Sequence, residues 1–214
     1  MTPREKLLLL RDEVSRHMDL YYVQNAPEIS DTEFDQLFRE LQDLENSHPE
    51  LWSPDSPVHR VGAAPLAEFQ KAKHVVPMLS LDNAFNEEEL RAFDLRVREL
   101  THDEDVEYSV ELKYDGLSLS LVYLDGVLSQ AVTRGDGTTG EVVTENARTV
   151  RGIPLRIQSG PLGRFEVRGE VLMSKSAFTE YNAERQAKGE PLLVNPRNAA
   201  SGGMRQLDSR LTAQ

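Results

Sequence analysis

Apolar residues near the N-terminus recur with the period of an α-helix. From Leu7 to Tyr21 they occupy every third or fourth position, after a Thr-Pro-Arg-Glu pattern in which threonine caps, proline opens the helix and glutamate completes a capping box. The same capping pattern recurs over residues 30–33, and a second apolar stripe begins at Phe34 and continues until Pro49 ends it. The sequence therefore predicts a helical hairpin, with a first helix over residues 3–23.

A third helix is expected after a proline-rich connection. Residues 49–65 carry several prolines and show no hydrophobic period, which is typical of a linker or a wrapped loop. We expect a domain boundary near residue 70. Asn86 is a helix-capping residue, and the apolar residues after it lie at helical spacing. They are Leu90, Phe93, Val97 and Leu100.

The second half of the chain changes to the two-residue period of β-strands. Alternating β-branched and aromatic residues predict strands over 106–115, 117–123, 127–133 and 165–173, with a tight turn at Asp125-Gly126. Short helices are predicted near 140–149 and over 176–186, and the small-residue tail is read as loop and helix. The predicted fold class is α+β, a helical hairpin followed by an antiparallel, β-rich part.

Composition narrows the class of protein. The 214 residues include no cysteine, which excludes disulfides, thiolate metal sites and a cysteine nucleophile within them. The apolar run near the N-terminus is four leucines flanked by charges, too short for a signal sequence or a membrane span. We therefore expect a soluble, cytoplasmic protein without a membrane partner. The net charge of −12 lies in the first half, whereas residues 111–214 are nearly neutral.

Three charged residues lie within the first predicted strand. If residues 106–115 are extended, Glu111, Lys113 and Asp115 share one face. They could form a cross-strand ladder of ion pairs, or a reactive site, because Gly116 removes a side chain where a ligand could approach the backbone. A lysine nucleophile must lose its proton, which flanking carboxylates disfavour. The group becomes reactive only if Mg²⁺ or further basic side chains neutralise the acids.

Two other patterns each allow two interpretations. Asp31 and Asp35 lie one helical turn apart, where acids favour the start of a helix. With Tyr21 and Tyr22 nearby in the hairpin, the two carboxylates could also receive a cation or a ring. Residues 135–140 match the GxGxxG fingerprint of dinucleotide-binding proteins, but the preceding strands are expected to form hairpins, which favours a glycine-rich turn.

Charged residues also gather later in the chain. Glu166, Arg168 and Glu170 share one face of a predicted strand. Several arginines offer planar donors suited to phosphate, although for any one of them an ordinary surface position is the favoured interpretation. They are Arg134, Arg197, Arg205 and Arg210.

The segment ELKYDG, residues 111–116, resembles the KxDG motif of covalent nucleotidyltransferases, with Lys113 at the nucleophile position. Further blocks resemble the NAD-dependent DNA ligases of bacteria, in the same order and over essentially the whole chain. They are YYVQNAPEISDTEFDQL, RVGAAPL, VPMLSLDNAF, TRGDGTTGE, EVRGEV and NPRNAASGGMRQLD. The chain is therefore similar to the N-terminal part of that family.

The resemblance implies two units and a reaction. Residues 1–70 would be a helical subdomain that binds the nicotinamide mononucleotide half of NAD, and residues 71–214 the first part of an adenylation domain with the nucleotidyltransferase (ATP-grasp-like ligase) fold. Lys113 would attack the α-phosphate of NAD, expel nicotinamide mononucleotide and become adenylated. The adenylyl group would pass to the 5′-phosphate of a DNA nick, and the 3′-hydroxyl would then displace AMP. Mg²⁺ or Mn²⁺ is the implied metal.

The family's motifs carry over residue by residue. Tyr22 stands where some members have histidine, and Phe34 where many have tyrosine. Contacts to the nicotinamide half are implied for Tyr21, Tyr22, Asp31, Thr32, Glu33, Phe34 and Asp35, and contacts along NAD for Ser80 and Leu81. Contacts to adenosine or phosphate are implied for Glu111, Asp115, Arg134 and Glu170, and contacts to phosphates or DNA for Arg197 and Arg205.

The family is longer than this chain. Its zinc module and its oligonucleotide-binding, helix-hairpin-helix and BRCT domains have no counterpart here, so zinc is expected only outside these residues. The resemblance implies a monomeric, cytoplasmic bacterial enzyme that acts at the nucleoid in DNA repair and replication, with NAD and nicked duplex DNA as partners. Two other hypotheses are a truncated paralogue that binds NAD or a protein partner, and a purely structural module, which leaves the ordered blocks unexplained.

Overall fold

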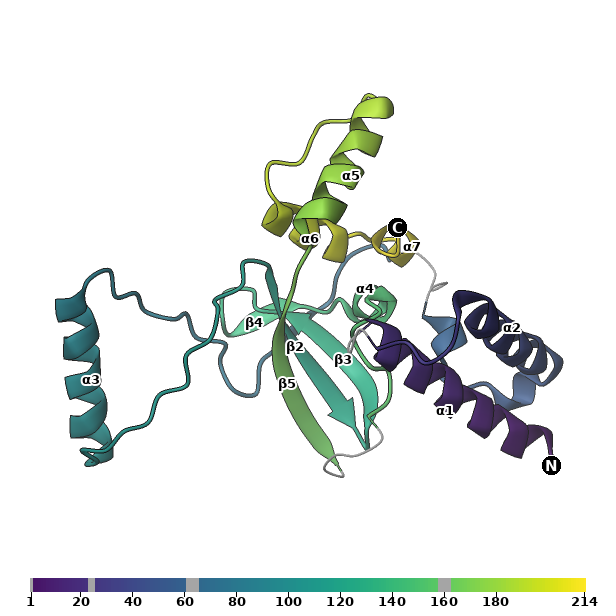
Figure 1. The fold of residues 1–214 in the computed structure, drawn as a ribbon, viewed down its shortest axis with the longest axis horizontal. Coiled ribbons are helices and arrows are strands. Elements are labelled where there is room, and N and C mark those ends of the chain that lie inside the picture. Colours follow the sequence, from purple (N-terminus) through teal and green to yellow (C-terminus); the bar gives the residue numbers. More distant parts are fainter. Residues whose placement is uncertain (1, 23–25, 61–65, 158–162) are drawn as a thin grey trace.

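The computed structural model describes residues 2–22, 26–60, 66–157 and 163–214, which form helices and two small antiparallel sheets (Figure 1). This arrangement confirms the predicted α+β class. A pair of N-terminal helices lies on one side of a three-stranded sheet, and α3 (Glu87–Thr101) stands off on the other side on two long connections. Within the described residues, no helix has both the length and the apolar character to cross a membrane.

The helical hairpin begins as its capping patterns predict. α1 (Pro3–Tyr22) follows Thr2, whose hydroxyl accepts a hydrogen bond from the backbone N–H of Glu5 at 3.3 Å. The Glu5 carboxylate in turn accepts from the backbone N–H of Thr2 at 2.7 Å. Ser30 and Glu33 make the same reciprocal pair at the start of the second helix. Each box satisfies N–H groups that a helix start otherwise leaves without partners.

The two helices pack along their predicted apolar stripes. A partly buried ion pair between them also contacts the segment that follows the second helix. Arg11 donates from Nε to Glu45 of α2 (Asp31–Ser47) at 2.6 Å and from Nη2 to the carbonyl of Leu51 at 2.8 Å. Because the Glu45 side chain is only 3% exposed, loss of Arg11 would leave a buried charge without this partner. The buried apolar residues of the hairpin are Leu7, Leu10, Val14, Met18 and Leu41.

Residues 49–60 join the hairpin to the sheet. They form two short 3-10 turns, η1 (Pro49–Leu51) and η2 (Pro57–His59), within the predicted linker. Arg60 attaches this segment to the second half of the chain. Its Nη1 donates at 3.0 to 3.2 Å to the carbonyl oxygens of Arg148, Val150 and Ile153. The rest of the predicted linker, residues 61–65, lies outside the described residues.

β2 (Leu117–Leu124) is the central strand of the larger sheet, whose order is β3-β2-β5. β3 (Val127–Thr133) follows it through the predicted turn at Asp125-Gly126, where φ is 48° and 80°. These left-handed angles suit an Asp-Gly pair in a two-residue hairpin. β5 (Arg164–Val171) pairs with β2 along its whole length. The three predicted strands of this sheet are confirmed to within two residues.

A second sheet pairs β1 (Lys71–Lys73) with β4 (Thr139–Glu141). The sequence does not predict it, because three residues are too few to show a period. The glycine-rich residues 135–140 form the turn between β3 and β4. A Cβ on Gly140 would lie 1.7 Å from the carbonyl oxygen of Thr133, so the turn requires glycine there. The GxGxxG pattern is therefore an antiparallel turn, as predicted, and not the start of a parallel dinucleotide-binding unit.

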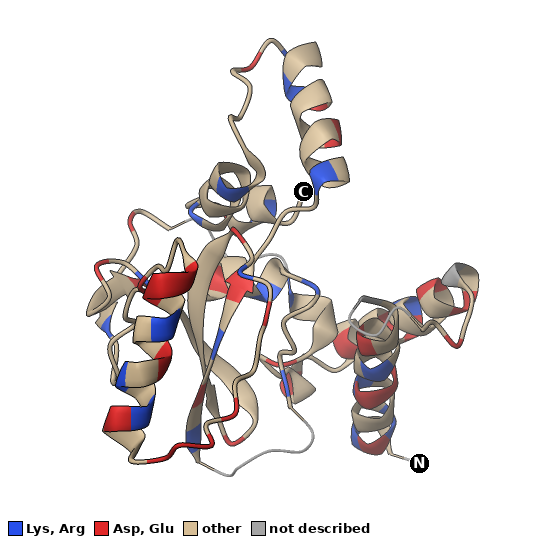
Figure 2. Ribbon diagram, turned by 60° about the vertical axis from the view of Figure 1, so that its left-hand side comes forward, with Lys and Arg blue, Asp and Glu red and all other residues tan. Residues whose placement is uncertain are grey.

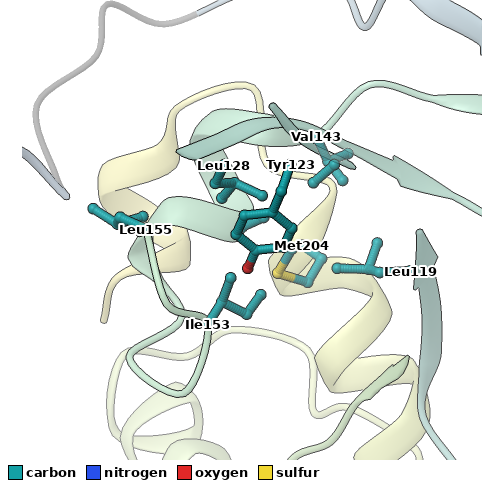
Figure 3. Close-up of a cluster of buried hydrophobic side chains, with 9 residues drawn as sticks. Leu119, Tyr123, Leu128, Val143, Ile153, Leu155 and Met204 are labelled. Atoms are coloured by element: carbon teal, nitrogen blue, oxygen red, sulfur yellow. The ribbon is translucent and has the colours of Figure 1, made fainter. Parts of the chain in front are cut away.

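The core of the second half is built around Tyr123 (Figure 3). This residue is 1% exposed, its ring stacks on Phe165 with centroids 5.2 Å apart, and its hydroxyl donates to the carbonyl of Pro154 at 2.8 Å. A buried phenol needs such a partner. Burial raises the pKa of Tyr123 to about 12. The other buried members are Leu119, Leu128, Ala131, Val143, Ala147, Ile153, Leu155 and Met204.

Short helices surround this core. α4 (Thr144–Thr149) packs against β3, and α5 (Lys175–Ala187) follows β5. The tail forms α6 (Pro196–Met204) and α7 (Ser209–Thr212), which contact each other. The helices predicted near 140–149 and over 176–186 are confirmed, although β4 takes the first residues of the former.

The prediction of a strand over residues 106–115 is wrong. These residues connect α3 to β2 and pair with none of the described strands. Their apolar side chains are exposed, 92% for Val110 and 77% for Leu112. Alternation makes a strand only where a neighbouring backbone and an apolar surface are available to it. α3 has the cap predicted at Asn86, yet none of its residues is buried, and acidic and basic residues alternate along it (Figure 2).

Candidate active site

A cleft of about 670 Å³ opens where the start of β2, the turn before β4 and the start of α6 meet. Its lining includes two acids, Asp136 and Glu141. Hydrogen bonds from the backbone N–H groups of Thr139 and Thr138 lower the pKa of Asp136 and keep it charged. Basic residues are more numerous and offer N–H donors suited to phosphate. They are Lys71, Arg134, Arg197 and Arg205.

Gly116 lies in this cleft, three residues after Lys113. A Cβ on Gly116 would lie 2.2 Å from the carbonyl oxygen of Val171 and 2.7 Å from Cδ2 of Leu172. The close approach of β5 therefore requires glycine here, whereas the sequence interpretation attributed it to a ligand. Lys113 itself belongs to the exposed segment that leads into β2.

The charged residues of ELKYDG do not form a ladder of ion pairs across strands. Glu111 accepts a hydrogen bond from the hydroxyl of Ser109 at 3.3 Å, and Asp115 Oδ1 accepts from Nη1 of Arg197 at 2.9 Å. Among the described residues, no hydrogen bond or ion pair joins Lys113 to either acid. Arg197 thus provides one of the cations that the sequence argument required to neutralise the acids beside the lysine.

Arg205 follows the last residue of α6 and is held by Glu141 of β4. Its Nε lies 2.6 Å from Oε2 of Glu141 and its Nη2 lies 2.9 Å from Oε1, a bidentate ion pair. This pairing with Glu141 raises the pKa of Arg205. Arg134, which follows β3, lines the same cleft. The structure therefore brings Arg134 of the block TRGDGTTGE together with Arg197 and Arg205 of the block NPRNAASGGMRQLD.

Glu170 lies on β5 beside the same cleft. It stands opposite Ser118, which lines the cleft, and its Oε2 accepts from the Ser118 hydroxyl at 2.8 Å. Further along β5, burial raises the pKa of Glu166, but hydrogen bonds from Ser120 and Arg168 outweigh it, so the pKa lies below its usual value. The carboxylates of this strand face are therefore held by hydrogen bonds to their neighbours.

Arg168 ties a connecting segment to the sheet. It donates to Glu166 at 3.0 Å and to the carbonyls of Val76 and Pro77, the latter at 3.0 Å. Ser80 and Leu81 come shortly after this attachment, and both are exposed. Neither of them lines the cleft of about 670 Å³ that contains the arginines.

A second cavity, of about 640 Å³, lies beside the helical hairpin. Tyr21, Phe34 and Asp35 line it, so the hairpin brings these predicted residues to one place. From outside the two helices, Arg60 and Arg151 contribute to the same lining. An aromatic surface, a carboxylate and guanidinium groups together suit a ligand that carries both a cationic ring and a phosphate.

The other residues predicted to contact the nicotinamide half lie at the start of α2 and the end of α1. The Glu33 carboxylate accepts from the backbone N–H and the hydroxyl of Ser30 at 2.9 and 2.7 Å, and these bonds lower its pKa. Thr32 is exposed, and neither residue lines the cavity. The side chains of Tyr22 and Asp31 lie outside the described part of the structure.

Comparison with known sequences decides the family. The family model described as the NAD-dependent DNA ligase adenylation domain matches residues 66–214, and that described as the DNA ligase-like, N-terminal NAD+-binding domain matches residues 1–62. The chain belongs to the NAD-dependent DNA ligase family. It is 53% identical over 213 residues to a DNA ligase of Brevibacillus brevis and 53% identical over 211 residues to one of Solibacter usitatus. These alignments cover 100% and 99% of the chain but 31% and 32% of the two relatives, so the chain spans about a third of their length.

Several residues of the two sites in this ligase-family chain were missed by sequence reasoning. Lys71 and Glu141 line the cleft because β1 and β4 pair, and Arg60 and Arg151 reach the helical cavity from elements outside the hairpin. Glu141 ends the block TRGDGTTGE, which was one available signal. Arg60 begins the block RVGAAPL, which was another available signal, whereas no local pattern around Lys71 or Arg151 indicates a site.

Proposed function

We propose that these residues form the NAD-reactive part of a bacterial DNA ligase that seals nicks in duplex DNA through a lysine-AMP intermediate. The observation that carries the proposal is that Lys113 of ELKYDG lies three residues before Gly116, which lines the arginine-rich cleft. Both ligase family models match the chain. Lys113 is the proposed nucleophile. The domains proposed are a helical unit over residues 1–70 and an adenylation unit over residues 71–214.

In the proposed first step, the deprotonated Nζ of Lys113 attacks the α-phosphate of NAD. A P–N bond forms, the bond to the bridging oxygen of the pyrophosphate breaks, and nicotinamide mononucleotide leaves with the electron pair, while Nζ loses a proton to solvent. A 5′-phosphate oxygen of the nick then attacks the adenylyl phosphorus. The P–N bond breaks, and Nζ of Lys113 leaves with the electron pair and takes up a proton. Finally the 3′-hydroxyl attacks the 5′-phosphorus and displaces AMP, and its proton is lost to solvent.

The side chains around Lys113 have proposed supporting roles. Arg197 pairs with Asp115 and so offsets the charge of one carboxylate that flanks the lysine in the sequence. Arg134 and Arg205 would bind phosphate oxygens, and Glu111 and Glu170 would contact adenosine or phosphate. The helical cavity with Tyr21, Phe34 and Asp35 would hold the nicotinamide mononucleotide half. The remaining residues that the resemblance implies there are Tyr22, Asp31, Thr32 and Glu33, and Ser80 and Leu81 along NAD.

Mg²⁺ or Mn²⁺ is proposed as an ion that arrives with the phosphates. Within the described residues, no group of three or more His, Cys, Asp or Glu side chains is arranged to hold a metal. Mg²⁺ is commonly bound by one or two carboxylates together with substrate phosphates, and Glu111 and Asp115 are exposed carboxylates of that kind. The metal would supply positive charge to the phosphates. A monomeric, cytoplasmic enzyme is proposed on the same resemblance.

The decisive experiment weighs the intact protein after incubation with NAD and Mg²⁺. The full-length protein encoded by the gene should gain one adenylyl group, Lys113→Ala should gain none, and the wild type should then seal a labelled nick. Absence of the adenylyl group in the wild type would overturn the proposal. Residues 1–214 alone should become adenylated slowly or not at all, because Lys113 lies in an exposed segment and these residues span only about a third of the length of the related ligases. A fast, complete reaction of that stretch would contradict this last expectation.

A further inference from the structure

The guanidinium of Arg205 has two edges that can each form a pair of parallel hydrogen bonds. Glu141 occupies one of them, since it accepts from Nε at 2.6 Å and from Nη2 at 2.9 Å. The other edge, formed by Nη1 and Nη2, carries further N–H donors. Within the described residues, Nη1 has no hydrogen-bond partner, and the Arg205 side chain is 53% exposed in the cleft. The pair therefore leaves free the edge that matches a phosphate group.

The backbone of Glu141 is fixed by strand pairing and by a hydrogen bond. Glu141 stands opposite Lys71 in the pairing of β4 with β1, and its N–H donates to the hydroxyl of Thr133 at 3.0 Å. The preceding Gly140 packs directly on the carbonyl of Thr133. The Glu141 side chain is only 26% exposed. A carboxylate carried on a backbone fixed in this way limits the rotamers of the long Arg205 side chain that pairs with it. Immobilising such a side chain otherwise costs free energy.

We propose that Glu141 is a positioning residue that holds Arg205 with its Nη1–Nη2 edge toward the cleft, where that edge binds a phosphate group of NAD or of the nicked DNA. The inference rests on the proposed ligase function. Glu141 does not contact the phosphate and acts through Arg205 alone. The charge of Glu141 also offsets that of Arg205. Removing Glu141 would therefore increase the positive charge of the cleft, and we still expect the ligase reaction to become slower.

The test measures two reactions in the full-length protein. One is adenylylation of Lys113 by NAD, and the other is the sealing of a nick that already carries the adenylyl group, which needs no NAD. Glu141→Ala should slow at least one of them about tenfold or more, as expected for a misplaced binding group. The slowed reaction identifies the source of the phosphate. Glu141→Gln keeps one acceptor for Nε and should slow it less, and Glu184→Ala, which removes an exposed acid on α5, should match the wild type.

A double-mutant cycle separates positioning from a general structural role. Arg205→Ala should slow the same reaction, and Glu141→Ala should add no further loss in that background. For the DNA arm, Arg205→Ala should reduce the salt dependence of binding by about one charge, whereas Glu141→Ala should leave it unchanged, because the arginine keeps its charge.

The inference is overturned if Glu141→Ala reacts like the wild type in both reactions, reacts faster, or loses the same factor with and without Arg205. If Glu141→Ala fails to fold, the cycle is run with Glu141→Gln and judged by the same criteria. A wild type that neither takes up an adenylyl group nor seals the nick would instead overturn the proposed function, so the two failures are distinguishable.

Discussion

Nη1 of Arg197 lies 2.9 Å from Oδ1 of Asp115, so the first turn of α6 is bonded to the residue two positions after Lys113. The two partners are 82 positions apart in the chain. Their side chains are 53% and 71% exposed, so the pair contributes little to folding stability. The pair places a guanidinium beside one of the two carboxylates that flank Lys113 in the sequence, so we expect its role in the charge of the reactive segment.

Arg197→Ala should slow adenylylation of Lys113 by about tenfold, because the cleft loses a proposed phosphate donor and Asp115 loses the cation that offsets its charge. The free energy of unfolding should fall by no more than about 1 kcal/mol, as is usual for an exposed pair. Intact mass over time, combined with urea unfolding, measures both quantities. The control is Arg91→Ala, which breaks the exposed Arg91–Glu87 pair on α3. It should change neither the adenylylation rate nor the free energy of unfolding. An adenylylation rate equal to that of the wild type would reject the role of Arg197.

Gly116→Ala should destabilise the fold by about 1–3 kcal/mol, the range for overpacking in a closely packed region. The added Cβ would lie 2.2 Å from the carbonyl oxygen of Val171, and neither β2 nor β5 can move without disturbing their pairing. Urea unfolding measures the effect. Gly152→Ala is a matched control, because a Cβ there has no neighbour within 4 Å among the described residues, and its stability should stay close to that of the wild type. Equal stability of the two variants would contradict the packing argument.

The buried phenol of Tyr123 makes stability depend on alkaline pH. Its pKa is raised to about 12 in the fold, against about 10 in an unfolded chain. The fold therefore favours the neutral phenol, and this contribution is fully present below pH 10 and is lost as the pH rises towards 12. A loss on the order of 2 kcal/mol is expected over that interval. Tyr123→Phe should cost about 1 kcal/mol at neutral pH, because the hydrogen bond to Pro154 is removed, yet flatten the alkaline loss.

Denaturant unfolding at a series of pH values measures this effect. Tyr114→Phe, at an exposed position, should keep the full alkaline loss. A Tyr123→Phe variant with the same alkaline loss as the wild type would show that other groups cause it.

Local patterns in the sequence were sufficient for the elements whose stabilising contacts are themselves local. The capping boxes at Thr2 and Ser30, the cap at Asn86 and the turn at Asp125-Gly126 each depend on residues within a few positions of one another. For the same reason, the GxGxxG segment could be assigned to a turn. These contacts form wherever the pattern occurs, so a single sequence reveals them.

Elements that depend on distant partners could not be predicted in this way. Residues 106–115 alternate like a strand, but no described strand pairs with them. β1 and β4 exist only because they pair with each other across a long separation, and Glu141 enters the cleft through that pairing. The contact between Asp115 and Arg197 was likewise invisible, since nothing near either residue indicates the other. The resemblance named Asp115 and Arg197 as site residues without indicating that they form a pair.

Asp35→Asn should slow adenylylation of Lys113 from NAD by about tenfold, chiefly through a higher KM for NAD. Asp35 lines the helical cavity with Tyr21 and Phe34, and the nicotinamide ring of NAD is a cation. A carboxylate beside it favours binding of the intact dinucleotide, and a tenfold loss corresponds to about 1.4 kcal/mol. Nicotinamide mononucleotide has left before the DNA steps, so sealing of a nick that already carries the adenylyl group should proceed at the wild-type rate.

The control for Asp35 is Asp43→Asn, which changes an exposed acid two turns further along α2 and outside the cavity. It should keep wild-type kinetics in both reactions, so that a loss confined to Asp35→Asn reflects the cavity and not the net charge of the hairpin. The measurement is the rate of adenylylation at several NAD concentrations, followed by sealing of the pre-adenylated nick. If Asp35→Asn slowed both reactions equally, the cavity would not be specific to the nicotinamide half, and the assignment of the helical unit to that half of NAD would be wrong.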